Sequence, residues 1–483
     1  MKKNLREIAK RVVKKVEIPD VHVSGISTDS QMIKPGELFI AIKGSKKDGH
    51  DYIQDAIKNG ASAVILDSEN IINIGVPFLR VRNTRKATST IASEFYGRPS
   101  SKLVIIGITG TNGKTTTASI LKNILLSEGK KTAQLGTLGV KVNGFSQPNS
   151  LTTPDAISLN TVFSKLIENN YSHVVMEVSS HSLDQYRVSG IDFKIGIFTN
   201  LTPEHLDYHG DMQSYFDAKA KLFKNLSRNS VAVINQSDPN GERLSHLTKA
   251  EKVFYYGGQN TGIHFEKFKL TTKGINGKIK IGKKYLQINS KLIGQFNLEN
   301  ILAAVAAANA LGISKDSIES GVRSCSIIPG RMEKFSLSNG AIVLVDYAHT
   351  PDAYKKLFIS LKSILIKDSD IYVVFGAGGE RDSDKRSSMA EIVDKYAKHA
   401  FITPDNPRNE NQSKIISDIK KGFKSSNYTV YNDRKKGLIA AILESNKNDI
   451  ITVLGKGREE YQEINGNKLF YSDIKVIEEF QWE

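Results

Sequence analysis

The sequence lacks most of the features that mark secreted and membrane proteins. Its 483 residues include one cysteine, Cys325, so an internal disulfide cannot form and no oxidising compartment is implied. No uninterrupted apolar run is long enough to span a bilayer. The basic N-terminus, residues 1–20, has neither an apolar segment nor a small-residue cleavage site. These absences favour a cytoplasmic protein with no membrane insertion.

Acidic residues are fewer than basic ones: 51 Asp and Glu against 67 Lys and Arg, for a formal net charge of +16. Such an excess is typical of proteins that bind nucleic acid, a lipid surface or a phosphorylated small molecule. The sequence contains no RNA-binding aromatic motif, zinc finger or basic helix, which argues against nucleic acid. A solvated, lysine-rich surface explains the excess equally well, so charge narrows the function little.

The chain is too long for one ordinary core, and its pattern changes twice. Residues 1–100 contain short strands and helices and end at a polar stretch, whereas residues 103–328 alternate buried-type strands with helices. Within that part, residues 251–293 are richer in strand-like alternation, and a helix over 297–312 follows, ending at Gly312. A second alternating unit begins near residue 330. We predict an α/β protein of three domains, 1–100, 101–329 and 330–483, with a mostly parallel central sheet.

A phosphate-binding loop is the strongest local signal. The predicted strand 103–109 leads into Gly110-Thr-Asn-Gly113-Lys114-Thr115 and then a helix. Glycines let backbone N–H groups surround a phosphate, the lysine neutralises it, and the threonine hydroxyl suits Mg²⁺. Ile108 stands where the general pattern has a glycine, and Gly107 and Gly110 are the nearest substitutes. The strand–loop–helix context still favours nucleotide binding.

Two further residues follow predicted strands. Glu177 ends strand 173–178 and His205 comes just after strand 195–201, at the edge where open α/β sheets bind ligands. Each has an ordinary structural interpretation, but beside a phosphate loop they suggest a Mg²⁺–nucleotide site. Because histidine is an unusual Mg²⁺ ligand, the residues alone favour an acid/base or orienting role for His205. Lys219 and Lys221, on a predicted helix over 214–223, are expected to form an exposed cationic face.

Three loops of the third segment also follow predicted strands: residues 376–386, 403–410 and 453–462. They carry glycines, carboxylates and arginines, and arginine grips a carboxylate with two parallel hydrogen bonds. Any one of them is equally well a glycine turn with solvated side chains. Together they are expected to converge on one crevice.

Taken in order, these motifs resemble those of the Mur ligase family. The matching stretches are TGTNGKT (109–115), EVSSH (177–181), HLDYHG (205–210), AKxxLF (218–223), GxFNxxN (294–300), GRxE (330–333), DYAHTPD (346–352) and DNPR (405–408). The resemblance implies an N-terminal domain for the uridine end of the substrate, a central P-loop-type ATPase domain and a C-terminal Rossmann-like domain. It also implies ATP and Mg²⁺ as cofactors.

Within the family, the resemblance is to the members that add meso-diaminopimelate to UDP-N-acetylmuramoyl-L-alanyl-D-glutamate. It implies an ADP-forming ligase of peptidoglycan precursor synthesis, and thereby a role in cell wall biogenesis, cell shape and cell division. ATP phosphorylates the D-glutamyl carboxylate, and the amine of the incoming amino acid attacks the acylphosphate. Phosphorylation supplies the leaving group that a carboxylate lacks. A monomer acting on these two small molecules is expected.

The resemblance assigns roles residue by residue. Lys114, Glu177, His205 and Lys219 are catalytic, with Thr115, Glu177, His205 and Lys219 around the metal and Lys219 carbamylated to N6-carboxylysine. A carbamate is an anion, able to bind Mg²⁺ where an ammonium repels it. The residues expected around ATP are Gly110, Thr111, Asn112, Gly113, Lys114, Thr115, Thr116, Asn297, Asn300, Arg331, Asp346 and His349.

Two more groups follow from the resemblance. The UDP-substrate is expected at Thr28, Ser30, Ser45, Lys46, Lys47, Thr152, Thr153, Ser179, Gln185 and Arg187. The amino acid is expected at Arg381, Asp405, Asn406, Pro407, Arg408, Gly455 and Glu459. Leu151 departs from the family pattern, in which asparagine can precede the two threonines. Arg458 also departs, since histidine often stands between GKG and the glutamate, and we interpret it as a tolerated change.

Three alternatives stay open. A folylpolyglutamate synthetase-like ligase shares the loop and the chemistry but does not need the DNPR stretch or the N-terminal STDS. A non-catalytic nucleotide-binding regulator leaves Lys219 and the three C-terminal loops without a role. The same ligase could also act on lanthionine or L-lysine. Arg408 favours meso-diaminopimelate over lysine, because an arginine suits a distal carboxylate rather than a second ammonium.

Overall fold

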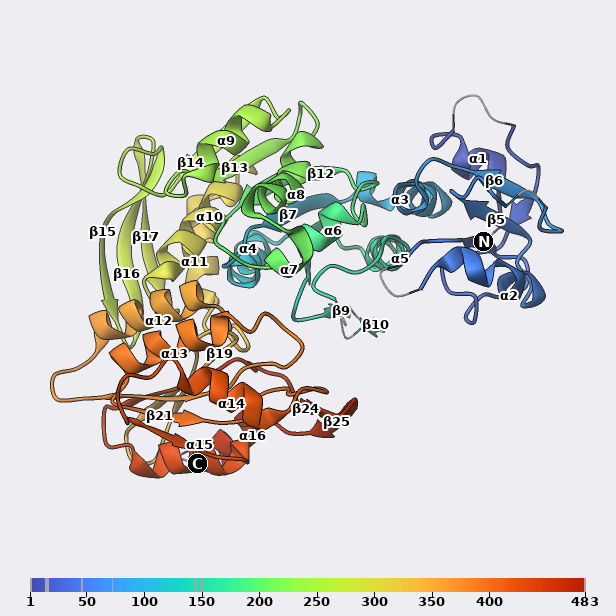
Figure 1. The fold of residues 1–483 in the computed structure, drawn as a ribbon. Helices are drawn as coiled ribbons and strands as arrows, with labels where there is room; N and C mark the ends of the chain where they lie inside the picture. The colour runs from blue at the N-terminus through green and yellow to red at the C-terminus, as the bar shows by residue number, and fades with distance from the viewer. Residues whose placement is uncertain are drawn as a thin grey trace.

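The computed structural model describes residues 2–13, 17–44, 47–71, 73–142, 145–147 and 151–481. Three sheets of four, nine and six strands follow one another along the chain, each with helices against it (Figure 1). The N-terminal sheet lies at one end of the molecule, and the C-terminal sheet packs beside the central one (Figure 1). Over the described residues, no helix is long and apolar enough to cross a bilayer.

The N-terminal sheet has four parallel strands in the order β3-β4-β5-β6. Leu38 and Ile40 pack on one face and Phe39 on the other, so a continuous apolar run serves a sheet that is covered on both faces. The elements here are β1 (Lys3–Asn4), α1 (Leu5–Ala9), β2 (His22–Val23), β3 (Ile26–Ser27), β4 (Leu38–Ile40), η1 (Gly49–Tyr52), α2 (Ile53–Lys58), β5 (Ala63–Leu66), β6 (Phe78–Arg80), α3 (Thr84–Phe95) and η2 (Pro99–Lys102).

The central sheet has the order β17-β16-β15-β14-β13-β12-β7-β11-β8. It is parallel from β8 to β15 and antiparallel through β15, β16 and β17. Its strands are β7 (Val104–Thr109), β8 (Thr132–Leu135), β11 (His173–Glu177), β12 (Phe193–Phe198), β13 (Val231–Asn235), β14 (Lys252–Tyr256), β15 (Ile263–Thr271), β16 (Gly274–Ile281) and β17 (Lys284–Ser290), with the separate hairpin β9 (Val140–Val142) and β10 (Phe145–Gln147).

Helices cover both faces of the central sheet. On β7, Ile106 and Ile108 belong to the core that α4 and α10 share, whereas Ile105 faces the core on the α5 and α8 side. The helices are α4 (Lys114–Ser127), α5 (Ala156–Glu168), α6 (Ser180–Asp184), α7 (Leu206–His209), α8 (Met212–Lys224), α9 (Asn240–Leu247), α10 (Phe296–Ala310) and α11 (Lys315–Ser324).

The C-terminal sheet has the order β18-β19-β23-β20-β21-β22, parallel except for the antiparallel edge strand β18. Separate apolar cores lie on its two faces. Its elements are β18 (Glu333–Ser336), β19 (Ile342–Asp346), α12 (Pro351–Ile364), β20 (Ile371–Phe375), α13 (Lys385–Tyr396), β21 (His399–Ile402), α14 (Gln412–Lys420), β22 (Tyr428–Val430), α15 (Arg434–Glu444), β23 (Ile450–Leu454), the hairpin β24 (Tyr461–Ile464) and β25 (Asn467–Phe470), and α16 (Asp473–Glu478).

The predicted α/β class with a mostly parallel central sheet is confirmed, and one surface prediction is wrong. Helix α8 does not present Lys219 to solvent, because the side chain is 2% exposed and its Nζ donates to the Gly110 carbonyl oxygen at 2.9 Å. Lys221 is half-buried and pairs with Asp184 at 2.7 Å. Apolar residues surround most of this helix, so a lysine within it can be buried.

Candidate active site

A cleft of about 850 Å³ lies between the central and C-terminal sheets. Its lining comes from loops that follow β7, β11 and β12 on one side and β19, β20, β21 and β23 on the other. These are the carboxyl ends of parallel strands, where open α/β sheets bind ligands. We call the two sides the central wall (residues 110–116, 177–181 and 200–207) and the C-terminal wall (residues 346–351, 378–385, 405–408 and 455–459).

The phosphate loop lies in the central wall between β7 and α4. Gly110 and Gly113 have φ values of +151° and +87°. A Cβ at Gly110 would collide with Thr199, and one at Gly113 with Asn300, so both glycines are required by shape as well as by conformation. Lys114 donates to the carbonyl oxygens of Gly110 and Thr111 at 2.9 Å each, and burial lowers the pKa of its ammonium.

Glu177 is held by donors from both sides of the loop. Thr115 Oγ1 donates to its Oε2 at 3.0 Å, and Thr137 donates from its backbone N to Oε1 at 2.9 Å and from Oγ1 to Oε2 at 3.2 Å. Arg331, from the other side of the cleft, reaches Thr115 Oγ1 at 3.4 Å. Thr137 was missed by the sequence reasoning, since no motif marks it.

Three histidines gather beside Lys219. The His181 ring lies 4.7 Å from that of His205 and 5.5 Å from that of His209, measured between centroids. Burial lowers the pKa of all three, that of His205 to about 4. Burial and the nearby Lys114 charge also hold the pKa of Lys219 well below its usual range. His205 and Glu177 both line the cleft, and the His205 ring packs edge-on against that of His181.

Glu204, which precedes His205, links the two walls. Its carboxylate lies 3.8 Å from His205 Nε2 and 3.4 Å from Nε2 of His349 on the C-terminal wall. Burial alone would raise the pKa of Glu204, but the hydrogen bond from His349 and the charges of His349, His205 and Lys114 outweigh it and hold the pKa far below its usual range. Sequence reasoning missed Glu204, although its place next to His205 was a usable signal.

The other predicted ATP residues divide into two groups. Arg331, Asp346, His349 and Asn300 line the cleft, and Asp346 accepts from the backbone N of Met332 and Ala348 at 2.7 and 2.8 Å. Asn297 does not reach the cleft: it donates to Ile293 O and accepts from Asn300 Nδ2 at 2.8 Å. Asn297 thus orients Asn300 from behind.

The C-terminal wall brings together three loops that are far apart in the sequence, as expected. Six of the seven residues predicted for the amino acid line the cleft, and these are Arg381, Asp405, Asn406, Arg408, Gly455 and Glu459. Pro407 is buried behind them. Arg408, at φ +52°, donates from NH1 to Gly379 O at 2.7 Å, and its Nε lies 3.3 Å from Glu463 on β24.

A buried lysine joins two of these loops. Lys456 Nζ donates to Asn406 Oδ1 and to Glu459 Oε2 at 3.1 Å each, and Asn406 Nδ2 donates to the same carboxylate oxygen at 2.9 Å. With its side chain fully buried, Lys456 fixes the amide orientation of Asn406 and one oxygen of Glu459. The sequence placed Lys456 in the loop but assigned it no role.

Arg458, which departs from the family pattern, has a defined partner. Its guanidinium forms a two-point ion pair with the buried Glu333, and Glu333 Oε2 accepts from the backbone N of Gly330 at 2.8 Å. The pair ties the loop after β23 to the junction between the central and C-terminal sheets. Leu151, the other departure, is 45% exposed and lines the cleft.

The residues predicted for the UDP-substrate fall in two places. Thr152, Ser179 and Arg187 line the cleft, and Arg187 donates to Thr153 O at 2.9 Å and to Gln185 Oε1 at 2.6 Å. Thr28, Ser30 and Lys47 lie within the first 100 residues and do not line this cleft. Ser45 and Lys46 lie outside the described residues.

Three models of the same family match the chain: the Mur ligase family catalytic domain at residues 22–96, the Mur ligase middle domain at 108–308 and the glutamate ligase domain at 330–457. Two curated relatives are both named UDP-N-acetylmuramoyl-L-alanyl-D-glutamate–2,6-diaminopimelate ligase. The protein from Geobacillus kaustophilus is 36% identical over 95% of this chain and 94% of its own length, and that from Aquifex aeolicus is 40% identical over 95% and 93%.

Solved structures agree with this. A structure with the same enzyme name has a TM-score of 0.69 and 29% identity, covering 99% of this chain and 98% of its own. A folylpolyglutamate synthase from Mycobacterium tuberculosis, complexed with ADP, has a TM-score of 0.64 but 16% identity, and covers 76% of this chain and 91% of its own; it shares the fold alone. The models, the near full-length relatives and the two-walled cleft together show that this chain belongs to the Mur ligase family.

Proposed function

We propose that the chain is an ATP-dependent, ADP-forming ligase that adds meso-diaminopimelate to UDP-N-acetylmuramoyl-L-alanyl-D-glutamate. The observation that carries this proposal is a cleft with a phosphate loop on one wall and carboxylates and arginines on the other. The relatives with that printed name span almost the whole chain, which favours this activity over folylpolyglutamate synthesis. The three segments 1–100, 101–329 and 330–483 are proposed as its domains.

The central wall is proposed to activate the D-glutamyl carboxylate. Lys114 neutralises the transferring phosphoryl group while a carboxylate oxygen attacks the γ-phosphorus of ATP, an O–P bond forms and ADP departs, which leaves an acylphosphate. The amine of the amino acid then attacks the acyl carbon, an N–C bond forms, phosphate departs and the amine nitrogen loses a proton. Because the walls come from different sheets, their relative position sets the distance between amine and acyl carbon.

Mg²⁺ fits the chemistry of the central wall. Thr115 and Glu177 present two hard oxygen donors 3.0 Å apart in the cleft, and Mg²⁺ commonly takes its other ligands from phosphates and water. Among the described residues, no three His, Cys, Asp and Glu side chains form a ready metal site. The ion would neutralise phosphate charge at Thr115 and Glu177, while Lys219 and His205 are the proposed residues of a second position.

Carbamylation of Lys219 is supported by its surroundings. The neutral amine, favoured by the lowered pKa, attacks CO₂, an N–C bond forms and one proton leaves, so the group becomes an anion. Its neighbourhood contains the ammonium of Lys114 and the three histidine rings. An anion at Lys219 would be attracted by the Lys114 charge and would supply a hard oxygen ligand.

The C-terminal wall is proposed to hold the amino acid in one orientation. Asp405 and Glu459 are the acceptors for an ammonium, whereas Arg408 and Arg381 are the donors for a carboxylate. Since Oε2 of Glu459 already accepts two hydrogen bonds, Oε1 is left for the substrate. A ligand with an ammonium and a carboxylate at its far end matches this arrangement better than one with a second ammonium only.

The proposal is tested by a panel of amino acids. Phosphate release is measured with ATP, the UDP-muramoyl-dipeptide and either meso-diaminopimelate, lanthionine, L-lysine or L-glutamate. We expect turnover to require the nucleotide substrate and to be fastest with meso-diaminopimelate. Turnover with L-glutamate and a folate would contradict this function, and so would ATP hydrolysis that is independent of both substrates. We also propose a cytoplasmic location and a part in cell division for the chain, and both rest on this activity.

A further inference from the structure

Nearly half of the net charge of the chain lies in one small part of the fold. Residues 263–291 contain eight lysines and one acidic residue, Glu266, for a net charge of +7 out of +16. This stretch is the antiparallel extension β15, β16 and β17 at one edge of the central sheet (Figure 1). The C-terminal wall and the phosphate loop lie elsewhere, and none of these lysines lines the active-site cleft.

The fold does not need these lysines. The inner face of the extension supplies Phe265, Ile275, Ile279, Leu286 and Ile288 to the core against α10. The outer face alternates with it and carries four of the eight lysines, Lys267, Lys269, Lys278 and Lys280, together with the amides of Asn276, Gln287 and Asn289. The inner face therefore supplies the buried apolar contacts of the three strands.

Cross-strand pairing brings like charges together on the outer face. Lys267 on β15 lies directly opposite Lys278 on β16, and like charges in that position destabilise a sheet. Of the eight lysines, only Lys278 has a carboxylate partner among the described residues, Glu266 at 3.4 Å. The stability of the sheet therefore does not explain the placement of these lysines.

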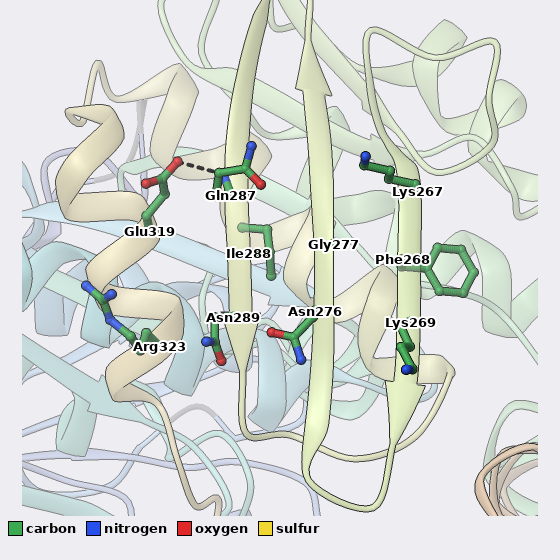
Figure 2. A pocket seen from close by; sticks show the side chains of 10 residues that line it. All are labelled: Lys267, Phe268, Lys269, Asn276, Gly277, Gln287, Ile288, Asn289, Glu319 and Arg323. Carbon is green, nitrogen blue, oxygen red and sulfur yellow. Dashed lines mark hydrogen bonds between the residues drawn. The ribbon is translucent and has the colours of Figure 1, made fainter.

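A shallow trough of about 550 Å³ runs across this face. Figure 2 shows Asn276, Gln287 and Asn289 on its floor, with Lys267 and Lys269 on one side and Arg323 of α11 on the other. Glu319 also lines the trough, where it accepts from the backbone N of Gln287 at 2.6 Å and lies 3.8 Å from Lys315. Cations with amide donors between them suit the oxygens of a phosphate ester.

We propose that the outer face of β15–β17 binds an anionic phospholipid surface through lipid phosphates. Each lysine near such a surface adds attraction that salt weakens, and many weak contacts suit a plane of headgroups. The face is part of a sheet at the edge of the molecule, so a bilayer can approach it without contacting the cleft (Figure 1). The contact is peripheral and reversible.

Other macromolecules fit this face less well. A protein interface is usually depleted of lysine and has an apolar centre, but this face has amides there, and Phe268 points away from β16 (Figure 2). Single-stranded nucleic acid needs aromatic stacking platforms, but the ring of Tyr285 is already covered by Lys278 Nζ at 3.8 Å. Both classes are outcomes of the test.

The test uses the full-length chain and vesicle sedimentation. Vesicles of phosphatidylcholine alone are compared with equal mixtures of phosphatidylcholine and phosphatidylglycerol, at low salt and at about 0.15 M salt. The test variant carries Lys267→Glu, Lys269→Glu and Lys280→Glu. The matched control carries Lys58→Glu, Lys424→Glu and Lys447→Glu, three exposed lysines on α2 and on C-terminal loops. Each triple change lowers the net charge from +16 to +10, since every reversal removes two units.

The wild-type chain should bind the anionic vesicles, and this binding should weaken as the salt concentration rises. It should not bind vesicles of phosphatidylcholine alone. The test variant should partition onto these vesicles at least about 100-fold more weakly, because each lysine near the surface raises the partition coefficient roughly fivefold. The partition coefficient of the control variant should fall much less. Both variants should keep wild-type ligase activity in solution, so failure of the ligase proposal would be seen separately. Absence of wild-type binding, or equal losses in the two variants, would overturn the proposal. So would tighter binding to a short oligonucleotide than to the anionic vesicles.

Discussion

The two walls of the cleft are built from the chain in different ways. The phosphate loop of the central wall is one continuous stretch, held by the conformation of Gly110 and Gly113 and by Lys114, which donates to carbonyl oxygens of its own loop. The C-terminal wall combines residues 381, 405–408 and 455–459, joined by side chains such as Lys456. The phosphate loop therefore depends on residues that are adjacent in the sequence, whereas the amino-acid site depends on contacts between loops that are far apart in the sequence.

Removal of the phosphate-loop lysine should have the largest effect. Lys114→Ala leaves the transferring phosphoryl group without its cation, so we expect turnover to fall by at least about 1,000-fold. Phosphate release is the measurement, and circular dichroism checks that the fold is kept. Lys122→Ala, on the same helix α4, is the control and should remain active. Near-normal turnover in Lys114→Ala would exclude this loop as the ATP site.

The next change tests whether Lys219 acts as an anion. Lys219→Ala should lose at least about 100-fold in turnover, and Lys219→Glu should retain clearly more, because a carboxylate replaces part of the carbamate. Lys221→Ala, two residues along α8, should be nearly unaffected. A crystal grown near neutral pH should show the extra carboxyl group on Nζ. A bare lysine in a fully active enzyme would contradict the proposal.

Selectivity between amino acids tests the C-terminal wall alone. Arg408→Ala should erase most of the preference for meso-diaminopimelate over L-lysine, since loss of a charge-assisted pair costs about 2–5 kcal/mol, or roughly 30- to several-thousand-fold. Arg408→Lys should restore part of it. KM for the amino acid should carry the effect, with KM for ATP unchanged. The adjacent Asn409→Ala is the control, and efficient use of L-lysine by the wild-type enzyme would refute this interpretation.

The smallest effect concerns Cys325, behind the central wall. Burial raises the pKa of its thiol to about 12 from an ordinary value of 9.0. Because the folded-state pKa is the higher one, its contribution to stability is complete below pH 9 and is lost as the pH rises towards 12. At pH 8 iodoacetamide should label this single cysteine only through opening of the fold. An ATP analogue should slow labelling several-fold and the amino acid alone should not; equal protection by both would show that the walls are not independent.

Local sequence was sufficient for much of the central wall. The helix predicted over 297–312 is α10 (Phe296–Ala310), and the strand predicted over 103–109 is β7 (Val104–Thr109), because apolar periodicity and glycine positions report directly on backbone conformation. The same reasoning failed for Lys219. A lysine between alanines on an amphipathic helix looks solvent-exposed until the packing of α8 against the phosphate loop is known.

The sequence by itself determined the fold class, the phosphate loop and the order of the strand-end loops, since each depends on residues close in the chain. Only the tertiary structure decided that Glu204 reaches His349 across the cleft, that Lys456 fixes Asn406 and Glu459, and that Arg458 pairs with Glu333. It also decided that Lys267 and Lys269 line one trough with Arg323. Burial and long-range pairing set the partners and the charge of a side chain, and both arise when elements distant in the sequence pack together.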